Sequence, residues 1–285
     1  MAYELKNVTV SYEKKTVLHD ITCSIEDGKW ISLIGQTGAG KSTFVKFLKG
    51  LVTSFTGEYT INDQPVKRDP KGNICIIPEI GFVFQYPEHQ LFETTVEKEL
   101  SFALKHQGYT QKAISEAMSV TLPIVDLSEE LLPYAPFQLS GGQKRKIAIA
   151  SVLMTKPKLL VVDEPTAGLD PVSHLQLLQQ LKNWQQETNG TVLFVSHHME
   201  DVAQYSDEVM VFHKGYLKGH FPTDILFLEK SSLLEQVGLA LPEVVELLHL
   251  VQELSGEKIH VSSCKEDEIF AQVMPILNAR RPAYE

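Results

Sequence analysis

The chain has 285 residues, and 43% of them are hydrophobic, which allows one large domain with its own core and a small one. Its formal net charge of −10 argues against a surface built to bind nucleic-acid phosphates. The cysteines at 23, 75 and 264 have neither metal nor disulfide spacing, which fits a reducing compartment.

The apolar pattern predicts strands that alternate with helices. Residues 3–10 and 16–25 alternate apolar and polar positions and predict an antiparallel layer. Further strands are predicted at 30–34, 57–61, 80–84, 159–162 and 191–195, and two more around Lys214-Gly215. This order indicates an α/β fold with a mostly parallel sheet.

Helical patterns fill much of the remaining sequence. Residues 95–133 are predicted to be helical with breaks at Gly108, Pro123 and Pro133, and a helix is predicted at 172–187. Residues 222–285 predict short helices with one strand candidate from Lys258 to Val261, which we interpret as an appended C-terminal domain.

The sequence predicts no membrane-spanning segment of its own. No apolar run approaches the ~18 residues that a spanning helix needs. Met1 leads directly into the first predicted strand, so we expect no signal peptide. Any association with a membrane is therefore expected to depend on a partner.

A glycine-rich run joins the predicted strand 30–34 to a predicted helix. Such glycines let the backbone curl so that its N–H groups point at phosphate oxygens beside a helix N-terminus. Lys41 is expected to reach the β- and γ-phosphates, and the Ser42 hydroxyl to bind Mg²⁺. A flexible turn is the alternative, but the full spacing between strand and helix favours a nucleoside triphosphate site, made by Gly35, Gln36, Thr37, Gly38, Ala39, Gly40, Lys41, Ser42 and Thr43.

A second motif, Leu139-Ser140-Gly141-Gly142-Gln143, stands directly before another helical run. Its glycines expose backbone amides at a helix N-terminus and Ser140 adds a hydroxyl, which predicts a second anion-binding surface. An ordinary Ser-Gly-Gly loop is the alternative. The basic residues that follow, Lys144 to Lys146, are predicted to lie on a solvated helical face.

Together the two motifs resemble those of the ATP-binding cassette family, and the resemblance covers roughly residues 1–220. It implies a P-loop NTPase core, a nucleotide-binding domain of residues 1–221 with a helical subdomain at about 86–155, and hydrolysis of ATP with Mg²⁺. In this family two cassettes close on two ATP molecules, and the signature motif of each, which residues 139–143 match, touches the nucleotide of the opposite subunit.

The resemblance also assigns roles to single residues. Asp163 would hold Mg²⁺ and Glu164 would polarise the attacking water, although paired acids after a strand also occur as helix caps. His197 would contact the γ-phosphate, whereas His198 is predicted to be an ordinary helix-start residue. Asp170 would communicate across the dimer, and Gln85 would link Mg²⁺ and water to the transport partner. Tyr12 would stack on adenine, although a half-buried tyrosine on a strand is the alternative.

The stretch from Phe84 to Glu97 is similar to the ATPases of energy-coupling factor transporters, importers of vitamins and related micronutrients, and resembles the second of their two ATPase types. That resemblance implies a heterodimer with a similar ATPase, a membrane coupling subunit and, indirectly, a substrate-binding membrane subunit, at the cytoplasmic membrane face. Residues 86–93, the docking segment, would receive the coupling subunit through Tyr86, Leu91 and Phe92, unless these side chains only pack under the helical subdomain. Residues 222–285 would help to hold the ATPases together.

Other functions stay open at this point. A cobalt- or nickel-type importer has a similar sequence pattern, and a soluble cassette protein acting on DNA or the ribosome is more remote because the chain is acidic and has no sustained heptads. A cassette that binds ATP without turnover is disfavoured because Glu164 and His197 are intact. The transported substrate is not encoded in this chain.

Overall fold

The computed structural model describes residues 2–13 and 15–279. These residues form two compact units, one from the residues up to Trp30 together with Ser42–Val195, the other from Ile31–Lys41 together with the residues from Ser196 onward. The last six residues of the predicted C-terminal domain, 280–285, and residues 1 and 14 lie outside the described residues.

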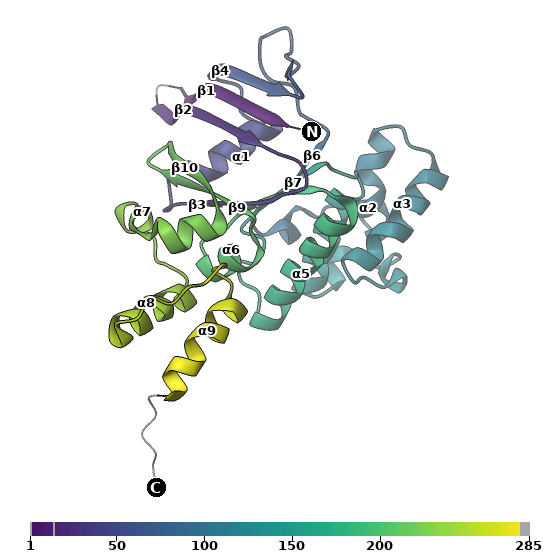
Figure 1. The fold of residues 1–285 in the computed structure, drawn as a ribbon. Coiled ribbons are helices and arrows are strands. Elements are labelled where there is room, and N and C mark those ends of the chain that lie inside the picture. The colour runs from purple at the N-terminus through teal and green to yellow at the C-terminus, as the bar shows by residue number, and fades with distance from the viewer. Residues whose placement is uncertain (1, 14, 280–285) are drawn as a thin grey trace. The chain divides into compact units, whose positions relative to one another are not determined.

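The first unit begins with the predicted antiparallel layer (Figure 1). Strands β1 (Tyr3–Tyr12), β2 (Lys15–Ile25), β4 (Phe55–Ile61) and β5 (Gln64–Pro65) lie in the order β2-β1-β4-β5. In β1 an irregularity between Leu5 and Val8, where Asn7 has φ +52°, keeps both apolar side chains buried on one side. One face of the layer therefore contributes to the core.

Three parallel strands of the same unit carry predicted site residues at their carboxyl ends. Strand β7 (Leu159–Asp163) pairs in parallel with β6 (Ile80–Val83) and with β8 (Thr191–Val195). All residues of these strands are buried, which is typical of strands covered on both faces. In sequence, helix α1 (Lys41–Lys49) precedes β6, and helix α5 (Pro171–Thr188) lies between β7 and β8.

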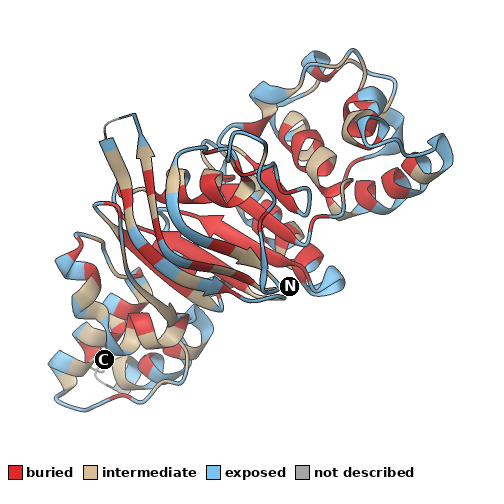
Figure 2. Ribbon diagram, turned by 90° about the horizontal axis from the view of Figure 1, so that it is seen from above, coloured by how far each residue is buried: buried red, intermediate tan, exposed pale blue. Residues whose placement is uncertain are grey.

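The segment between β6 and β7 is helical, as predicted. It comprises η1 (Pro87–Gln90), α2 (Val96–His106), α3 (Gln111–Ile124), η2 (Glu129–Leu131), η3 (Pro136–Gln138) and α4 (Gly141–Leu153). Thr95, Thr110 and Ser140 cap α2, α3 and α4 by accepting a backbone N–H at the first turn. Buried positions line the inner faces of these helices (Figure 2). Helix α3 ends at Ile124, one residue beyond the predicted break at Pro123.

The second unit holds β3 (Trp30–Ile34) from Ile31 onward, β9 (Glu208–His213) and β10 (Tyr216–Pro222), with β3 parallel and β10 antiparallel to β9. Helix α6 (Met199–Tyr205) precedes β9, and η4 (Ile225–Glu229), α7 (Ser231–Gln236), α8 (Glu243–Ser255) and α9 (Glu266–Ala279) follow β10. These elements confirm the α/β class with its antiparallel layer and its mainly helical C-terminal region.

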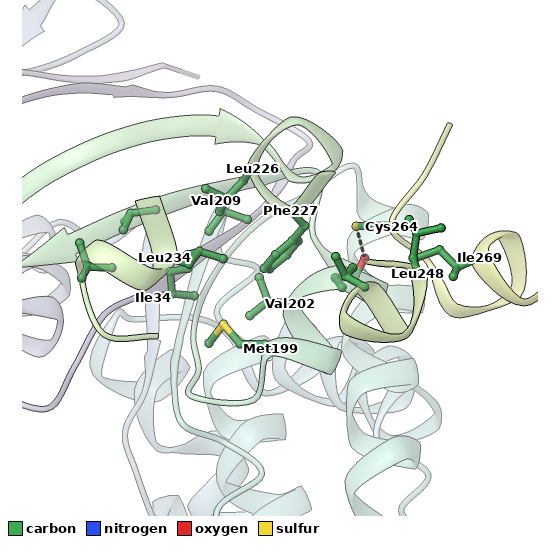
Figure 3. Packing of buried hydrophobic residues seen from close by; sticks show 14 of the residues in the cluster. Ile34, Met199, Val202, Val209, Leu226, Phe227, Leu234, Leu248, Cys264 and Ile269 are labelled. Atoms are coloured by element: carbon green, nitrogen blue, oxygen red, sulfur yellow. Dashed lines mark hydrogen bonds between the residues drawn. The ribbon is translucent and has the colours of Figure 1, made fainter. Parts of the chain in front are cut away.

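The C-terminal helices share a core with the rest of the second unit (Figure 3). Phe227 and Leu234 pack with Ile34 of β3 and Val202 of α6 in one buried cluster. The buried Cys264 donates its thiol to the carbonyl of Ala203 at 3.8 Å. The C-terminal region is therefore continuous with the core that supports β3.

The strand candidate at Lys258 to Val261 is wrong, because the structure has no strand there. Ile259 is buried in the cluster of the second unit, and its N–H is satisfied by the Gln252 side chain at 3.1 Å rather than by a sheet. The alternating apolar residues of this stretch pack a loop against the buried cluster of the second unit. Among the described residues, no helix combines the length and apolar character that crossing a membrane requires.

Candidate active site

The glycine-rich loop of residues 35–41 lies between β3 and α1 in the second unit. Gly35 has φ +152°, and a Cβ at this position would come within 2.3 Å of the Phe212 carbonyl oxygen, so only glycine fits. Gly38 has φ +80° and no atom within 4 Å of its would-be Cβ, so the loop offers open space at its tip. This combination of a tight base and an open tip suits a phosphate group.

Lys41 places a cation inside that loop. Its side chain is buried, and its Nζ donates to the carbonyl oxygens of Gly35 at 2.6 Å and Gln36 at 3.2 Å. The helix α1 begins at Lys41, so the amine and the helix N-terminus provide positive potential in the same stretch of chain. Ser42 and Thr43 are the next residues of α1, with Ser42 exposed and Thr43 partly exposed.

The acidic pair stands at the carboxyl end of β7 in the first unit. Asp163 is the last residue of the strand and is buried, while Glu164 follows with φ +49°. The Nε2 of Gln85, two residues beyond β6, donates to the Glu164 Oε2 at 2.6 Å. Since β6 and β7 are adjacent parallel strands, their carboxyl ends bring these two predicted residues together.

The signature motif forms the capped N-terminus of α4. The N–H of Gln143 donates to the Ser140 hydroxyl at 3.2 Å, and the Ser140 N–H donates to the Gln143 side-chain oxygen at 3.0 Å. Gly141 and Gly142 are exposed, and no atom lies within 4 Å of a Cβ built on either. The described chain gives no packing reason for glycine here, so the open space beside the amides suits a group from outside it.

Other predicted residues occupy the ends of secondary-structure elements. Asp170 caps α5 by accepting the N–H groups of Val172 and Ser173, each at 3.1 Å. These hydrogen bonds, from Ser173 first, lower the pKa of the Asp170 carboxyl. His197 is exposed in the second unit, and His198 is the N-cap residue of α6, as predicted. Tyr12 ends β1 with 46% of its surface exposed.

A groove of about 600 Å³ lies in the first unit beside the docking segment. Leu91 and Phe92 line it together with Phe102 of α2, and the Phe92 and Phe102 rings meet edge to face with centroids 4.8 Å apart. Phe92 is 64% exposed. Tyr86 does not line the groove, and its ring stacks on His89 instead. Of the three predicted docking side chains, two therefore belong to the groove.

The predicted solvated face of residues 144–146 is wrong at Arg145, which is only 4% exposed. Its Nε and Nη2 donate to both carboxylate oxygens of Glu88, at 2.9 and 2.7 Å. Its Nη1 donates to the carbonyl oxygens of Pro165 and Ala167, at 3.0 and 2.9 Å. Arg145 lies one helical turn before the buried Ile149, and that i, i+4 relation could have identified it as an inward-facing residue.

The comparisons with known proteins agree with this geometry. The sequence profile of the ABC transporter family matches residues 18–167. The chain is 38% identical, over 95% of its own length and 94% of the relative's, to the "Energy-coupling factor transporter ATP-binding protein EcfA2" of Clostridium perfringens (strain 13 / Type A). The chain belongs to the ATP-binding cassette family.

Two solved structures of this family are similar in fold. The structure of cbiO1 from Clostridium perfringens, part of the ABC transporter complex cbiONQ, matches with a TM-score of 0.73 and 29% identity over 87% of this chain and 98% of that chain. The dimeric post-hydrolysis structure of the ATP-binding cassette MJ0796, bound to ADP and Pi, matches with a TM-score of 0.65 and 26% identity over 78% and 98% of the two chains.

Within the ATP-binding cassette family, the chain belongs to the ATP-binding subunits of energy-coupling factor transporters. It is an ATP-binding and ATP-hydrolysing protein with the predicted P-loop NTPase core. Among the predicted site residues, 35–41 and His197 belong to the second unit, and Gln85, Asp163 and Glu164 belong to the first.

Proposed function

We propose that this chain is one of two similar ATPases that power an importer of vitamins or related micronutrients at the cytoplasmic face of the cell membrane. The observation that carries the proposal is the pair of signature glycines, Gly141 and Gly142, which are exposed beside open space at a capped helix N-terminus. A site open in this way can accept a phosphate held by another subunit, which is how paired ATPases share their nucleotides.

The glycine-rich loop binds the triphosphate of ATP. Lys41 neutralises charge on the β- and γ-phosphate oxygens, and the backbone N–H groups of residues 36–43 direct their positive ends at the phosphates. The loop fits this role because Lys41 is already held within it by two carbonyl contacts and because the tip at Gly38 is open. Tyr12 stacks on the adenine ring.

Oxygen ligands for Mg²⁺ come from Ser42, Gln85 and Asp163. A hydroxyl, an amide oxygen and a carboxylate are the hard donors that this cation prefers. Because the amide nitrogen of Gln85 donates to Glu164, its oxygen is the atom that would serve as a ligand. When bound, the cation supplies charge neutralisation to the phosphates.

Hydrolysis depends on positioning more than on covalent chemistry. Glu164 orients and polarises the attacking water, and His197 contacts the γ-phosphate. The Gln85 amide holds the Glu164 carboxylate from the docking-segment side. Asp170, fixed at the N-cap of α5, communicates with the paired subunit.

Pairing with the second ATPase also involves residues 222–285. Leu250 and Leu254 are exposed one turn apart on α8, and Phe270 and Met274 are exposed one turn apart on α9. The two helices pack against each other, so their exposed apolar side chains offer a surface for a similar subunit.

The groove beside the docking segment receives a helix of the membrane coupling subunit. Its walls are mostly apolar, with Leu91, Phe92 and Phe102 among them, and exposed aromatic side chains suit a protein interface. Lys49 also lines the groove and donates to the Ile77 carbonyl at 2.8 Å, and burial lowers its pKa. The groove thus offers the partner a hydrophobic contact with little free charge. A substrate-binding membrane subunit would join through that partner.

A second candidate is the ATPase of another ABC importer, for example one of the cobalt or nickel type. The fold likeness to a subunit of the cbiONQ complex favours keeping it. The two candidates differ in their membrane partners rather than in the chemistry of this chain.

Replacing Glu164 by Gln tests the hydrolytic role. The variant is expected to bind ATP and pair with the second ATPase, but to lose at least about 100-fold in turnover because the base that orients water is gone. Steady-state phosphate release and size-exclusion chromatography with ATP measure both properties. Glu187→Gln on the exposed surface of α5 is the control. Normal turnover by Glu164→Gln would remove Glu164 from its proposed role.

A further inference from the structure

Arg145 lies at the centre of a buried polar network on the signature helix α4. It uses four hydrogen bonds, two to the Glu88 carboxylate and two to the carbonyls of Pro165 and Ala167. The side chains of Arg145 and Glu88 are 5% and 15% exposed. A cation buried to this degree needs its counter-charge, and the bidentate geometry supplies it with directional bonds.

The partners of Arg145 belong to two functional segments. Glu88 lies in η1, within the docking segment, whereas Pro165 and Ala167 belong to the loop that follows Glu164. Gln85, directly before the docking segment, also donates a hydrogen bond to Glu164, directly before this loop. Two separate connections therefore run between the proposed membrane-partner surface and the proposed hydrolytic carboxylate.

The far end of the docking segment is anchored independently. The buried Glu99 of α2 accepts the N–H groups of Phe92 and Glu93 on its Oε2, at 3.0 and 2.8 Å. A helix that presses on Phe92 would therefore act on a segment that is held by Glu99 at Phe92 and Glu93 and by Arg145 at Glu88. Hydrogen-bonded networks of this kind can carry energetic coupling between sites.

We propose that Arg145 is a positioning residue that couples movement of the docking segment to the loop carrying Glu164. The inference rests on the proposed function. The guanidinium is planar, so its contacts to Glu88 on one edge and to Pro165 and Ala167 on another fix the two segments in one geometry. A shift of Glu88 must carry the guanidinium along or leave a buried charge without its partner. The loop after Glu164 then moves with the docking segment.

The next residue of α4 provides a natural contrast. Lys146 donates to the carboxylate of Asp126 at 2.9 Å and to its backbone carbonyl at 3.1 Å. The Asp126 side chain is 83% exposed, and Asp126 belongs to neither the docking segment nor the loop after Glu164. Lys146 thus forms an ion pair on the same helix without the proposed coupling.

The test compares ATP hydrolysis by the purified pair of ATPases with hydrolysis by the whole membrane complex, with Mg-ATP as the only ligand. The wild-type ratio of the two kcat values measures the influence of the membrane proteins. Arg145→Lys keeps the positive charge, but its ammonium group cannot bond to Glu88 and to the Pro165 and Ala167 carbonyls in the geometry of the planar guanidinium. Glu88→Gln keeps an acceptor oxygen but loses the negative charge. Each is expected to bring the ratio to within about twofold of one, while KM for ATP in the pair changes by less than about twofold.

The double variant distinguishes coupling from general loss of structure. Because both residues act in one connection, Arg145→Lys with Glu88→Gln is expected to have no larger effect than the stronger single variant. Lys146→Gln is expected to keep the wild-type ratio.

Retention of the wild-type ratio by both Arg145→Lys and Glu88→Gln would overturn the inference, and so would multiplication of their effects in the double variant. If Arg145→Lys does not fold, Glu88→Gln alone decides by the same criterion. If the membrane proteins do not change wild-type hydrolysis, the proposed function fails together with this inference, whereas loss of coupling by the control variant overturns only the inference.

Discussion

The side-chain amide of Gln85 donates to the Glu164 carboxylate at 2.6 Å. Gln85 follows β6 and Glu164 follows β7, so residues 79 positions apart meet where two adjacent parallel strands end. A carboxylate held by an amide keeps one orientation, which is what a residue that must direct water needs. The bond also ties the proposed hydrolytic residue to the segment that the membrane partner would contact.

The signature glycines lead to a prediction that separates stability from function. Gly142→Ala adds a methyl group with no atom of the chain within 4 Å, and alanine is the better helix residue, so the free energy of unfolding is expected to rise by up to about 0.5–1 kcal/mol. In the proposed pair of ATPases, the same methyl would lie against the phosphates of the other subunit's nucleotide and is expected to lower turnover by about 100-fold. Thermal unfolding and phosphate release measure the two effects.

Gly81→Ala is the matched contrast for this experiment. Its Cβ would lie 2.8 Å from the Cγ1 of Val152, so this variant is expected to lose stability. Full turnover by Gly142→Ala would show that no phosphate approaches the signature helix.

The groove beside the docking segment leads us to expect that a substitution in it weakens binding of the membrane partner and leaves ATP binding unchanged. Phe92→Ala removes a ring that is 64% exposed in the groove, and is expected to weaken the membrane partner by at least about tenfold while ATP affinity stays the same. Co-purification in detergent and binding of a fluorescent ATP analogue provide the measurements. Tyr109→Ala, which removes an exposed ring outside the groove lining, is the control. Unchanged recovery of the partner with Phe92→Ala would argue against this surface.

Glu88 makes stability depend on acid pH. Burial alone would raise its pKa, but the hydrogen bond and the charge of Arg145 hold the pKa below the ordinary value of 4.5. The unfolded chain therefore binds this proton more readily than the folded one does, so the contribution is complete above about pH 5 and is lost as the pH falls through the folded pKa.

Thermal unfolding of the wild type and of Glu88→Gln tests this sign. The wild type is expected to be the more stable protein at neutral pH, and the difference in Tm is expected to shrink below about pH 5. Glu187→Gln, at an exposed position, should show no such trend. A difference that grows on acidification would contradict the assigned direction.

Much of the fold follows from local sequence patterns. The strand at 30–34 and the strand at 191–195 were predicted with their observed bounds, because continuous apolar runs between polar turns mark buried parallel strands. Glycines at 35, 38 and 40 predicted the loop for a similar reason, since positive φ and close backbone approach restrict the choice of residue.

Residues whose environment depends on distant segments were harder to predict. The basic run at 144–146 gave no sign that Arg145 pairs with a carboxylate 57 positions earlier. The alternation at 258–261 predicted a strand, but the described chain places no strand beside it and packs Ile259 in a cluster instead. Contacts of long sequence separation determined both outcomes.

The most direct test of the account is to purify the tagged chain from its native membranes in mild detergent and to identify every co-purifying protein by mass spectrometry. We expect to recover a second, similar cassette ATPase, one membrane coupling protein and small integral membrane proteins that bind substrate. Recovery of the chain without a second ATPase and without membrane proteins, under conditions that keep such complexes intact, would contradict its role as a transport ATPase.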